Sequence, residues 1–159
     1  MLEGKNILLR PLKISDLYFL EHIENNNENW KYGSEKKKYN WAELEDYIKK
    51  SSTDISIAKQ YRFVIDLHNT PIGFIDLYDY TENSAGIGII VAKDYRNKGF
   101  AKEALSTLID YSFDHLNMTQ LNAIVEKKNQ PSIKLFFSCD FRINTEKENL
   151  KYFTRLAKN

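Results

Sequence analysis

This sequence has a single cysteine, no long apolar run and no excess of one charge. Each of these features excludes a class of protein. The single cysteine, Cys139, cannot form a disulfide within the chain, which favours a reducing compartment and makes the cytoplasm the expected location. No apolar stretch approaches the roughly 18 residues of a membrane helix, so no membrane partner is expected. Lys and Arg number 23 against 22 Asp and Glu, and this balance provides no field that would hold nucleic acid.

Chain breaks and clusters of metal ligands are also scarce. The sequence of 159 residues contains only three prolines. No Ser/Gly-rich linker or fixed-period repeat divides the chain. A chain of this length suits one compact core, so we expect a single domain over residues 1–159. The three histidines, His22, His68 and His115, lack the paired spacing of metal ligands, and no metal is expected.

The apolar pattern predicts a mixed α/β sheet with helices on its faces. The expected elements, in chain order, are a strand at 6–12, helices that open at Ser15 with Asp16 and at Asn40, an antiparallel hairpin over 61–80, a strand at 87–91, a helix from 101 to about 116, a strand at 120–125, a helix at 129–139, and one or two strands at 141–143 and 152–154. In the second helix, Asn40 and Glu43 predict reciprocal capping of the first turn. The unbroken apolar run at 87–91 predicts a central strand that is buried on both faces.

The most informative segment, residues 89–105, runs from a buried strand through a loop into a helix. The first N–H groups of a helix have no partners within it, so together with the helix dipole they can bind an anion such as a pyrophosphate. Gly99 lets the backbone approach closely, small Ala101 avoids crowding, and Arg96 and Lys98 add positive charge. On the glycine alone, an ordinary turn before an amphipathic helix is the better interpretation.

Several motifs in the same order favour the anion-binding interpretation. Residues 96–101 resemble the acyl-CoA signature Arg/Gln-x-x-Gly-x-Gly/Ala of the Gcn5-related N-acetyltransferase (GNAT) superfamily. Residues 129–141 resemble the family's Asn-x-x-Ser-Ile-x-Leu-Tyr-x-x-x-Gly-Phe helix. Residues 9–12 with Asp16, and residues 72–75, are similar to the branch that contains spermidine N-acetyltransferases and ribosomal-protein alanine acetyltransferases. The resemblance extends from about residue 8 to residue 141.

The resemblance implies the GNAT acyl-CoA N-acyltransferase fold, with a central, mostly antiparallel sheet flanked by helices, and direct transfer of an acetyl group from acetyl-CoA to a primary amine. It assigns the coenzyme to the backbone of Ile89, Ile90 and Val91 for the pantetheine arm, to Arg96, Asn97, Lys98, Gly99, Phe100, Ala101 and Lys102 for the pyrophosphate, and to Asn129 on the next helix. As a helix cap before Pro131, Asn129 has an equally good local explanation, and the two roles are compatible.

Acidic residues are the candidates for the amine site. An alkylammonium with a pKa near about 10.4 is mostly protonated at neutral pH, so a carboxylate should help to remove its proton, directly or through water. The resemblance points to Glu35, Glu43 and Asp79 as substrate-binding residues, with Asp76 nearby on the same strand. Glu35 and Asp79 are the catalytic candidates, with Glu35 favoured. Capping explains Glu43 without any function, and solvent-facing strand positions would explain Asp76 and Asp79.

Three departures from the family pattern affect the mechanism. Phe136 stands where many relatives have a tyrosine that can protonate the coenzyme A thiolate, and phenylalanine has no such proton. Gly86 stands where the polyamine enzymes carry a glutamate, so that carboxylate is either replaced or unnecessary. Asp140 replaces the usual glycine, and the final hairpin is expected to be compressed into residues 144–149.

The sequence therefore predicts an N-acetyltransferase whose acceptor is a small-molecule amine, with a polyamine-like molecule favoured over a peptide N-terminus. The alternative is a non-catalytic acyl-CoA sensor or assembly module, which the loss of proton-transfer groups at Phe136 and Gly86 would support. Self-association into a homo-oligomer stays open.

Overall fold

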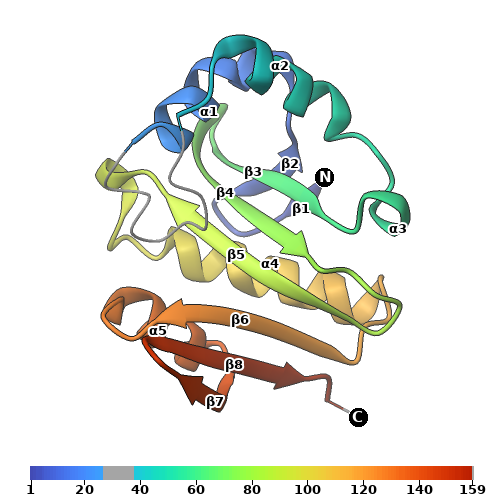
Figure 1. The fold of residues 1–159 in the computed structure, drawn as a ribbon, viewed down its shortest axis with the longest axis vertical. Coiled ribbons are helices and arrows are strands. Elements are labelled where there is room, and N and C mark those ends of the chain that lie inside the picture. Colours follow the sequence, from blue (N-terminus) through green and yellow to red (C-terminus); the bar gives the residue numbers. More distant parts are fainter. Residues whose placement is uncertain (27–37, 159) are drawn as a thin grey trace.

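The computed structural model describes residues 1–26 and 38–158 and has one eight-stranded sheet, in the order β1-β2-β3-β4-β5-β6-β8-β7 (Figure 1). The strands are β1 (Leu2–Glu3), β2 (Leu8–Pro11), β3 (Tyr61–Leu67), β4 (Thr70–Tyr78), β5 (Ser84–Val91), β6 (Gln120–Glu126), β7 (Arg142–Lys147) and β8 (Leu150–Leu156). The helices are α1 (Leu17–Glu24), α2 (Trp41–Lys50), α3 (Ile55–Ala58), α4 (Phe100–Asp114) and α5 (Gln130–Ser138), with 3₁₀ turns at Ile14–Asp16 and Lys93–Tyr95.

The sheet is antiparallel except where β5 meets β6. These two strands run parallel and pair only between residues 84–86 and residues 120–122. Beyond that point they diverge, and Figure 1 shows them close at one end and separated at the other. The rest of β6 pairs with β8. The expected mixed, mostly antiparallel sheet is confirmed.

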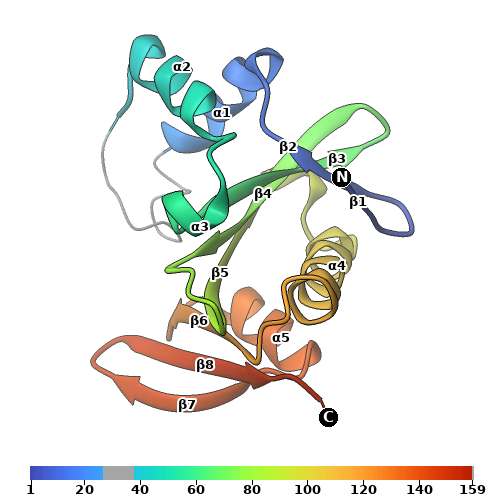
Figure 2. The ribbon, with the colours of Figure 1, turned by 90° about the vertical axis from the view of Figure 1, so that its right-hand side faces the viewer.

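Two hydrophobic cores lie on opposite faces of this sheet. Period-two alternation along β3 directs Phe63 and Ile65 into the core beneath α4 and α5, and Val64 into the core beneath α1 and α2. Figure 2 shows α1 and α2 on one side of the sheet and α4 on the other. The two faces of β5 are therefore directed toward different helices. These helices determine from which side a ligand can reach the strand.

Most of the expected elements are confirmed. The hairpin is β3 and β4, and the expected helix over residues 101–116 is α4. In α2 the predicted capping box is present, because Asn40 Oδ1 accepts from Glu43 N at 2.8 Å while Asn40 N donates to Glu43 Oε1 at 3.2 Å.

Two elements were not foreseen and two expectations were wrong. Leu2–Glu3 forms an additional edge strand, and α3 was not foreseen because four residues show no helical period. The final hairpin is not compressed into residues 144–149, since β7 continues to Lys147. The apolar run of β5 is not buried throughout, because Ile89 and Ile90 are half-buried and line a cavity.

None of the helices in the described part of the chain has both the length and the hydrophobicity needed to cross a bilayer.

A buried cluster of charged side chains holds the N-terminal elements to the sheet. The Arg10 guanidinium donates to Asp16 at 2.9 and 2.8 Å and to Asp66 at 2.7 Å, and the three side chains are 9, 2 and 8% exposed. Asp16 also accepts from Lys13 N at 2.8 Å, where α1 is about to begin. The hydrogen bond to Asp16 outweighs burial and raises the pKa of Arg10 above its ordinary value. The cluster therefore connects β2, β3 and the first helix.

We expect Asp16→Ala to lower the free energy of unfolding by about 3–5 kcal/mol, because it leaves a buried guanidinium short of one partner. Asp46→Ala is the matched control, since its Lys50 partner lies 2.8 Å away but the two side chains are 59 and 75% exposed. The control should cost less than about 1 kcal/mol. Urea unfolding measures both, and equal midpoints for the two variants would contradict a structural role for the cluster.

Candidate active site

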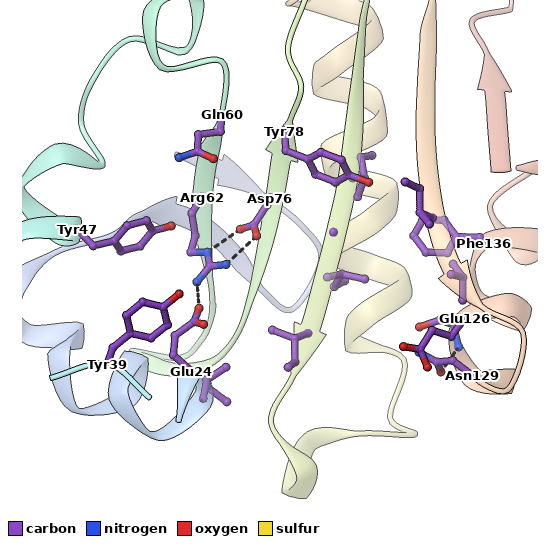
Figure 3. A pocket seen from close by; sticks show the side chains of 18 of the residues that line it. Glu24, Tyr39, Tyr47, Gln60, Arg62, Asp76, Tyr78, Glu126, Asn129 and Phe136 are labelled. Atoms are coloured by element: carbon purple, nitrogen blue, oxygen red, sulfur yellow. Dashed lines mark hydrogen bonds and ion pairs between the residues drawn. The ribbon is translucent and has the colours of Figure 1, made fainter. Parts of the chain in front are cut away.

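One cavity of about 1080 Å³ is lined both by candidates for the amine site and by residues expected to bind the coenzyme. The first group includes Glu43 and Asp76, and the second includes Ile89, Ile90 and Asn129. Its walls come from α1 and α2, from β3 to β5, and from β6 with α5. Figure 3 shows side chains from these elements facing a common space. The cavity therefore has an α1–α2 side and a side at the β5–β6 divergence.

An arginine held by two carboxylates dominates the α1–α2 side. Arg62 donates to Asp76 through Nε and an amino group, both at 2.8 Å, and it also pairs with Glu24 (Figure 3). Its guanidinium carbon lies 4.9 Å from the Phe74 ring centroid and 5.6 Å from that of Tyr47. Burial alone would lower the pKa of Arg62, but the charge of Asp76, with contributions from Tyr47 and Glu24, raises it well above its ordinary value. Arg62 is therefore a fixed positive charge that two carboxylates already neutralise.

The cavity wall carries more negative than positive charge. Five of the described lining residues are acidic and one is basic: Glu24, Glu43, Asp46, Asp76 and Glu126, against Arg62. One carboxylate oxygen of Glu126 is buried without a hydrogen-bond partner, and the nearest cation is Lys128 Nζ at 3.6 Å. Because carboxylates attract cations, this excess of negative charge suits a ligand with several positive charges.

On the other side, an unpaired edge of β5 faces the gap left by β6. Ala92 N donates to Ile72 O at 2.7 Å, toward β4. Because peptide groups alternate along an antiparallel strand, those of Ile89 and Val91 face the β6 side, whereas those of Ile90 face β4. We call the gap between residues 87–91 of β5 and residues 123–126 of β6 the β5–β6 notch. It offers amide hydrogens and carbonyl oxygens to an extended polar chain, as pantetheine binding would require.

The loop before α4 has the geometry expected of an anion site. Gly99, the N-cap of α4, has φ 86°, in the region that favours glycine, and no side chain caps the helix. The first bond within the helix is Glu103 N to Gly99 O at 3.1 Å. The N–H groups of Phe100, Ala101 and Lys102 therefore have no intrahelical acceptor, as in sites that hold phosphates.

The rest of this loop is held against β5. Arg96 Nε donates to Val91 O at 2.8 Å, which fixes the loop to the end of the strand. Asn97 has φ 62°, a left-handed conformation that asparagine tolerates better than most residues. Lys98 Nζ lies 5.9 Å from the Tyr95 ring centroid. These residues form the end of the notch nearest the helix.

Asn129 connects the notch to α5. Its side chain accepts from Ser132 N at 3.3 Å, so it caps the helix, and it also lines the cavity beside Phe136. Both explanations offered for Asn129 are therefore compatible with its position.

The four acidic candidates are not gathered at one point. Glu43 and Asp76 line the cavity, although Glu43 also completes the capping box and Asp76 is bound to Arg62. Asp79 is exposed and lines a smaller cavity of about 230 Å³. Glu35 lies outside the described residues.

The sequence did not single out Arg62, Glu24, Tyr47 or Glu126 as site residues. A signal existed for Arg62, because it shares the face of β3 that carries buried Val64, and a charge on such a face indicates a paired or functional site. Within residues 1–26 and 38–158, no three His, Cys, Asp or Glu side chains are grouped as metal ligands.

Comparison with known proteins agrees with this geometry. A family model described as an acetyltransferase (GNAT) domain matches residues 6–142. Spermidine N(1)-acetyltransferase of Vibrio cholerae is 31% identical over 141 residues, which cover 87% of this chain and 80% of the relative. The Escherichia coli (strain K12) enzyme of the same name is 29% identical over 148 residues, covering 92% and 78%.

A solved structure extends the likeness to three dimensions. The crystal structure of spermidine N-acetyltransferase from Vibrio cholerae, in complex with CoA and spermine, matches with a TM-score of 0.85 and 26% identity over 96% of each chain. The chain therefore belongs to the GNAT family, whose members are acetyl-CoA-dependent N-acetyltransferases.

Proposed function

We propose that this acetyltransferase modifies a primary amine of a small polycation of the polyamine class. The excess of carboxylates over guanidinium groups on the cavity wall supports this acceptor, because each further ammonium group of a polyamine finds a negative partner. A peptide N-terminus brings one positive charge at the reacting end and gains less from such a wall. The relatives named as spermidine N-acetyltransferases in Escherichia coli and Vibrio cholerae support the same class.

In this proposal the donor occupies the β5–β6 notch. The peptide groups of Ile89 and Val91 hold the pantetheine arm, and the N–H groups of Phe100, Ala101 and Lys102 hold the pyrophosphate. Arg96, Asn97, Lys98 and Gly99 shape the loop, and Asn129 and Ile90 bound the notch. The acetyl carbonyl then faces the acidic part of the same cavity, where the amine binds.

Transfer requires a neutral amine nitrogen, and a carboxylate is the acceptor for its proton. Glu35 and Asp79 are our candidates for this role, with water as the relay where the carboxylate does not reach the nitrogen. Glu43 and Asp76 contribute to binding through their charge. The protein forms no acyl-enzyme in this mechanism, because the amine attacks the thioester directly.

Release of the coenzyme A thiol, followed with a thiol reagent, distinguishes the possible acceptors. We expect kcat/KM for spermidine to exceed that for an alkyl monoamine of similar length by at least about tenfold, which corresponds to about 1.4 kcal/mol of differential binding. The monoamine is the control for charge, because it presents the same reacting group. Peptides with free N-termini should react more slowly than spermidine. Equal values for the triamine and the monoamine, or a preference for peptides, would contradict the proposed acceptor.

Binding of coenzyme A tests the donor site independently of the acceptor. Gly99→Trp places a bulky side chain at a positive φ beside the exposed N–H groups, so it should weaken binding by at least about tenfold in isothermal titration. No atom lies within 4 Å of a β-carbon built at Gly99, so the folded core should tolerate the change. Thermal unfolding close to that of the unchanged protein provides the control. Undiminished affinity in the folded variant would place the pyrophosphate elsewhere.

A further inference from the structure

The departing thiolate of coenzyme A needs a proton, and α5 does not supply one. Phe136 lines the cavity, but its ring packs 5.1 Å from that of Phe141 and 5.9 Å from that of Phe153 and carries no acidic hydrogen. If the chain turns over as proposed, another group near the β5–β6 notch takes this role.

Tyr78 reaches the notch from the neighbouring strand. In the β4–β5 ladder Tyr78 is paired with Gly86, so both residues face the same side of the sheet. A β-carbon on Gly86 would overlap the Tyr78 ring, which therefore lies across β5 in space that only glycine leaves open. Figure 3 shows the hydroxyl directed past β5, toward the side of Phe136.

The position of this hydroxyl coincides with the point where β5 and β6 separate. Gly86 is the last residue of β5 that pairs with β6. Tyr78 lines both the large cavity, together with Phe136, and the smaller cavity that contains Asp79. The phenol thus lies at the closed end of the notch, where an acetyl thioester held along β5 would end.

The chemical state of Tyr78 suits a proton donor. Burial, followed by the charges of Asp79 and Asp76, raises the pKa of Tyr78 above its ordinary value, so the phenol is neutral at neutral pH. Its hydroxyl has no hydrogen-bond partner within the described part of the chain and is available to a ligand. Tyr39 and Tyr47 also line the cavity, but they lie on the far side of the Arg62 cluster from the notch (Figure 3).

We propose that Tyr78 is the catalytic acid that protonates the coenzyme A sulfur, and that Gly86 is required because it makes room for the Tyr78 ring. This proposal rests on the proposed acetyl transfer. The amine nitrogen bonds to the acetyl carbon, the carbon–sulfur bond breaks with its electron pair on sulfur, and the Tyr78 O–H proton moves to sulfur. The nitrogen releases a proton, and water carries a proton back to the resulting phenolate. Amine and thioester thereby become amide and thiol, with no other reactant.

Removal of one oxygen atom tests the assignment. Tyr78→Phe keeps the ring over Gly86, so it should fold normally, bind coenzyme A with an unchanged dissociation constant, and lower kcat by about 100-fold. Tyr61→Phe is the matched control, because Tyr61 lies on neighbouring β3, is also a half-buried phenol with a raised pKa, and does not line either cavity. The control should retain its kcat within about twofold.

Two further variants test whether kcat depends on the position of the phenol and not only on its presence. Gly86→Ala keeps the hydroxyl but displaces the ring, so it should also lower kcat at least about tenfold while coenzyme A still binds. Adding Phe136→Tyr to Tyr78→Phe supplies a phenol from α5 and should recover part of the lost kcat.

The outcomes distinguish the acid role from the underlying activity. Failure of the unchanged protein to release thiol with any amine would overturn the proposed function. Normal turnover in both the protein and Tyr78→Phe would overturn the role of Tyr78 alone. A Tyr78→Phe variant that loses coenzyme A affinity in proportion to its rate would assign Tyr78 to binding and would also overturn the acid role.

Discussion

β5 and β6 are parallel neighbours that pair over only three positions before they separate. A buried strand edge normally satisfies its peptide groups against the next strand, because unpaired N–H and C=O groups are costly away from water. Here the edge of β5 beyond Gly86 faces a cavity, while β6 pairs with β8 on its other side and so stays in the sheet. The proposed donor site depends on this separation, because it leaves the N–H and C=O groups of Ile89 and the N–H of Val91 available to a ligand, while Val91 O accepts from Arg96.

The α1–α2 side of the cavity depends on the glycines of the same strand. Gly86 and Gly88 alternate on one face of β5, and their missing side chains leave room for Tyr78 and for the acidic cavity above Asp76. α1 and α2 close that space by packing on Val64 and Phe74. The buried Arg10 cluster holds the beginning of this unit to β3, and none of its three residues lines the cavity. Different charged groups on one sheet face thus hold the strands together and line the cavity.

Local features of the sequence predicted the elements beside the β5–β6 notch well. The loop at residues 96–101, the helix that follows and the cap at Asn129 are each encoded within a few residues, so pattern and propensity were sufficient. The α1–α2 side of the cavity was predicted less well, because Arg62, Glu24 and Asp76 meet only through strand register and helix docking. Gly86 shows the difference most directly. In the sequence it stands where the related enzymes have a glutamate, whereas in the fold its lack of a side chain leaves room for the Tyr78 ring.

The open edge of β5 can be tested by hydrogen exchange at single amides, measured by NMR with and without coenzyme A. Without ligand, the amides of Ile89 and Val91 should exchange faster than that of Ile90, which faces β4. Saturating coenzyme A should slow exchange at Ile89, Val91 and residues 100–102 while Ile90 changes little. Equal protection of all three β5 amides without ligand, or no slowing when coenzyme A is bound, would contradict the account.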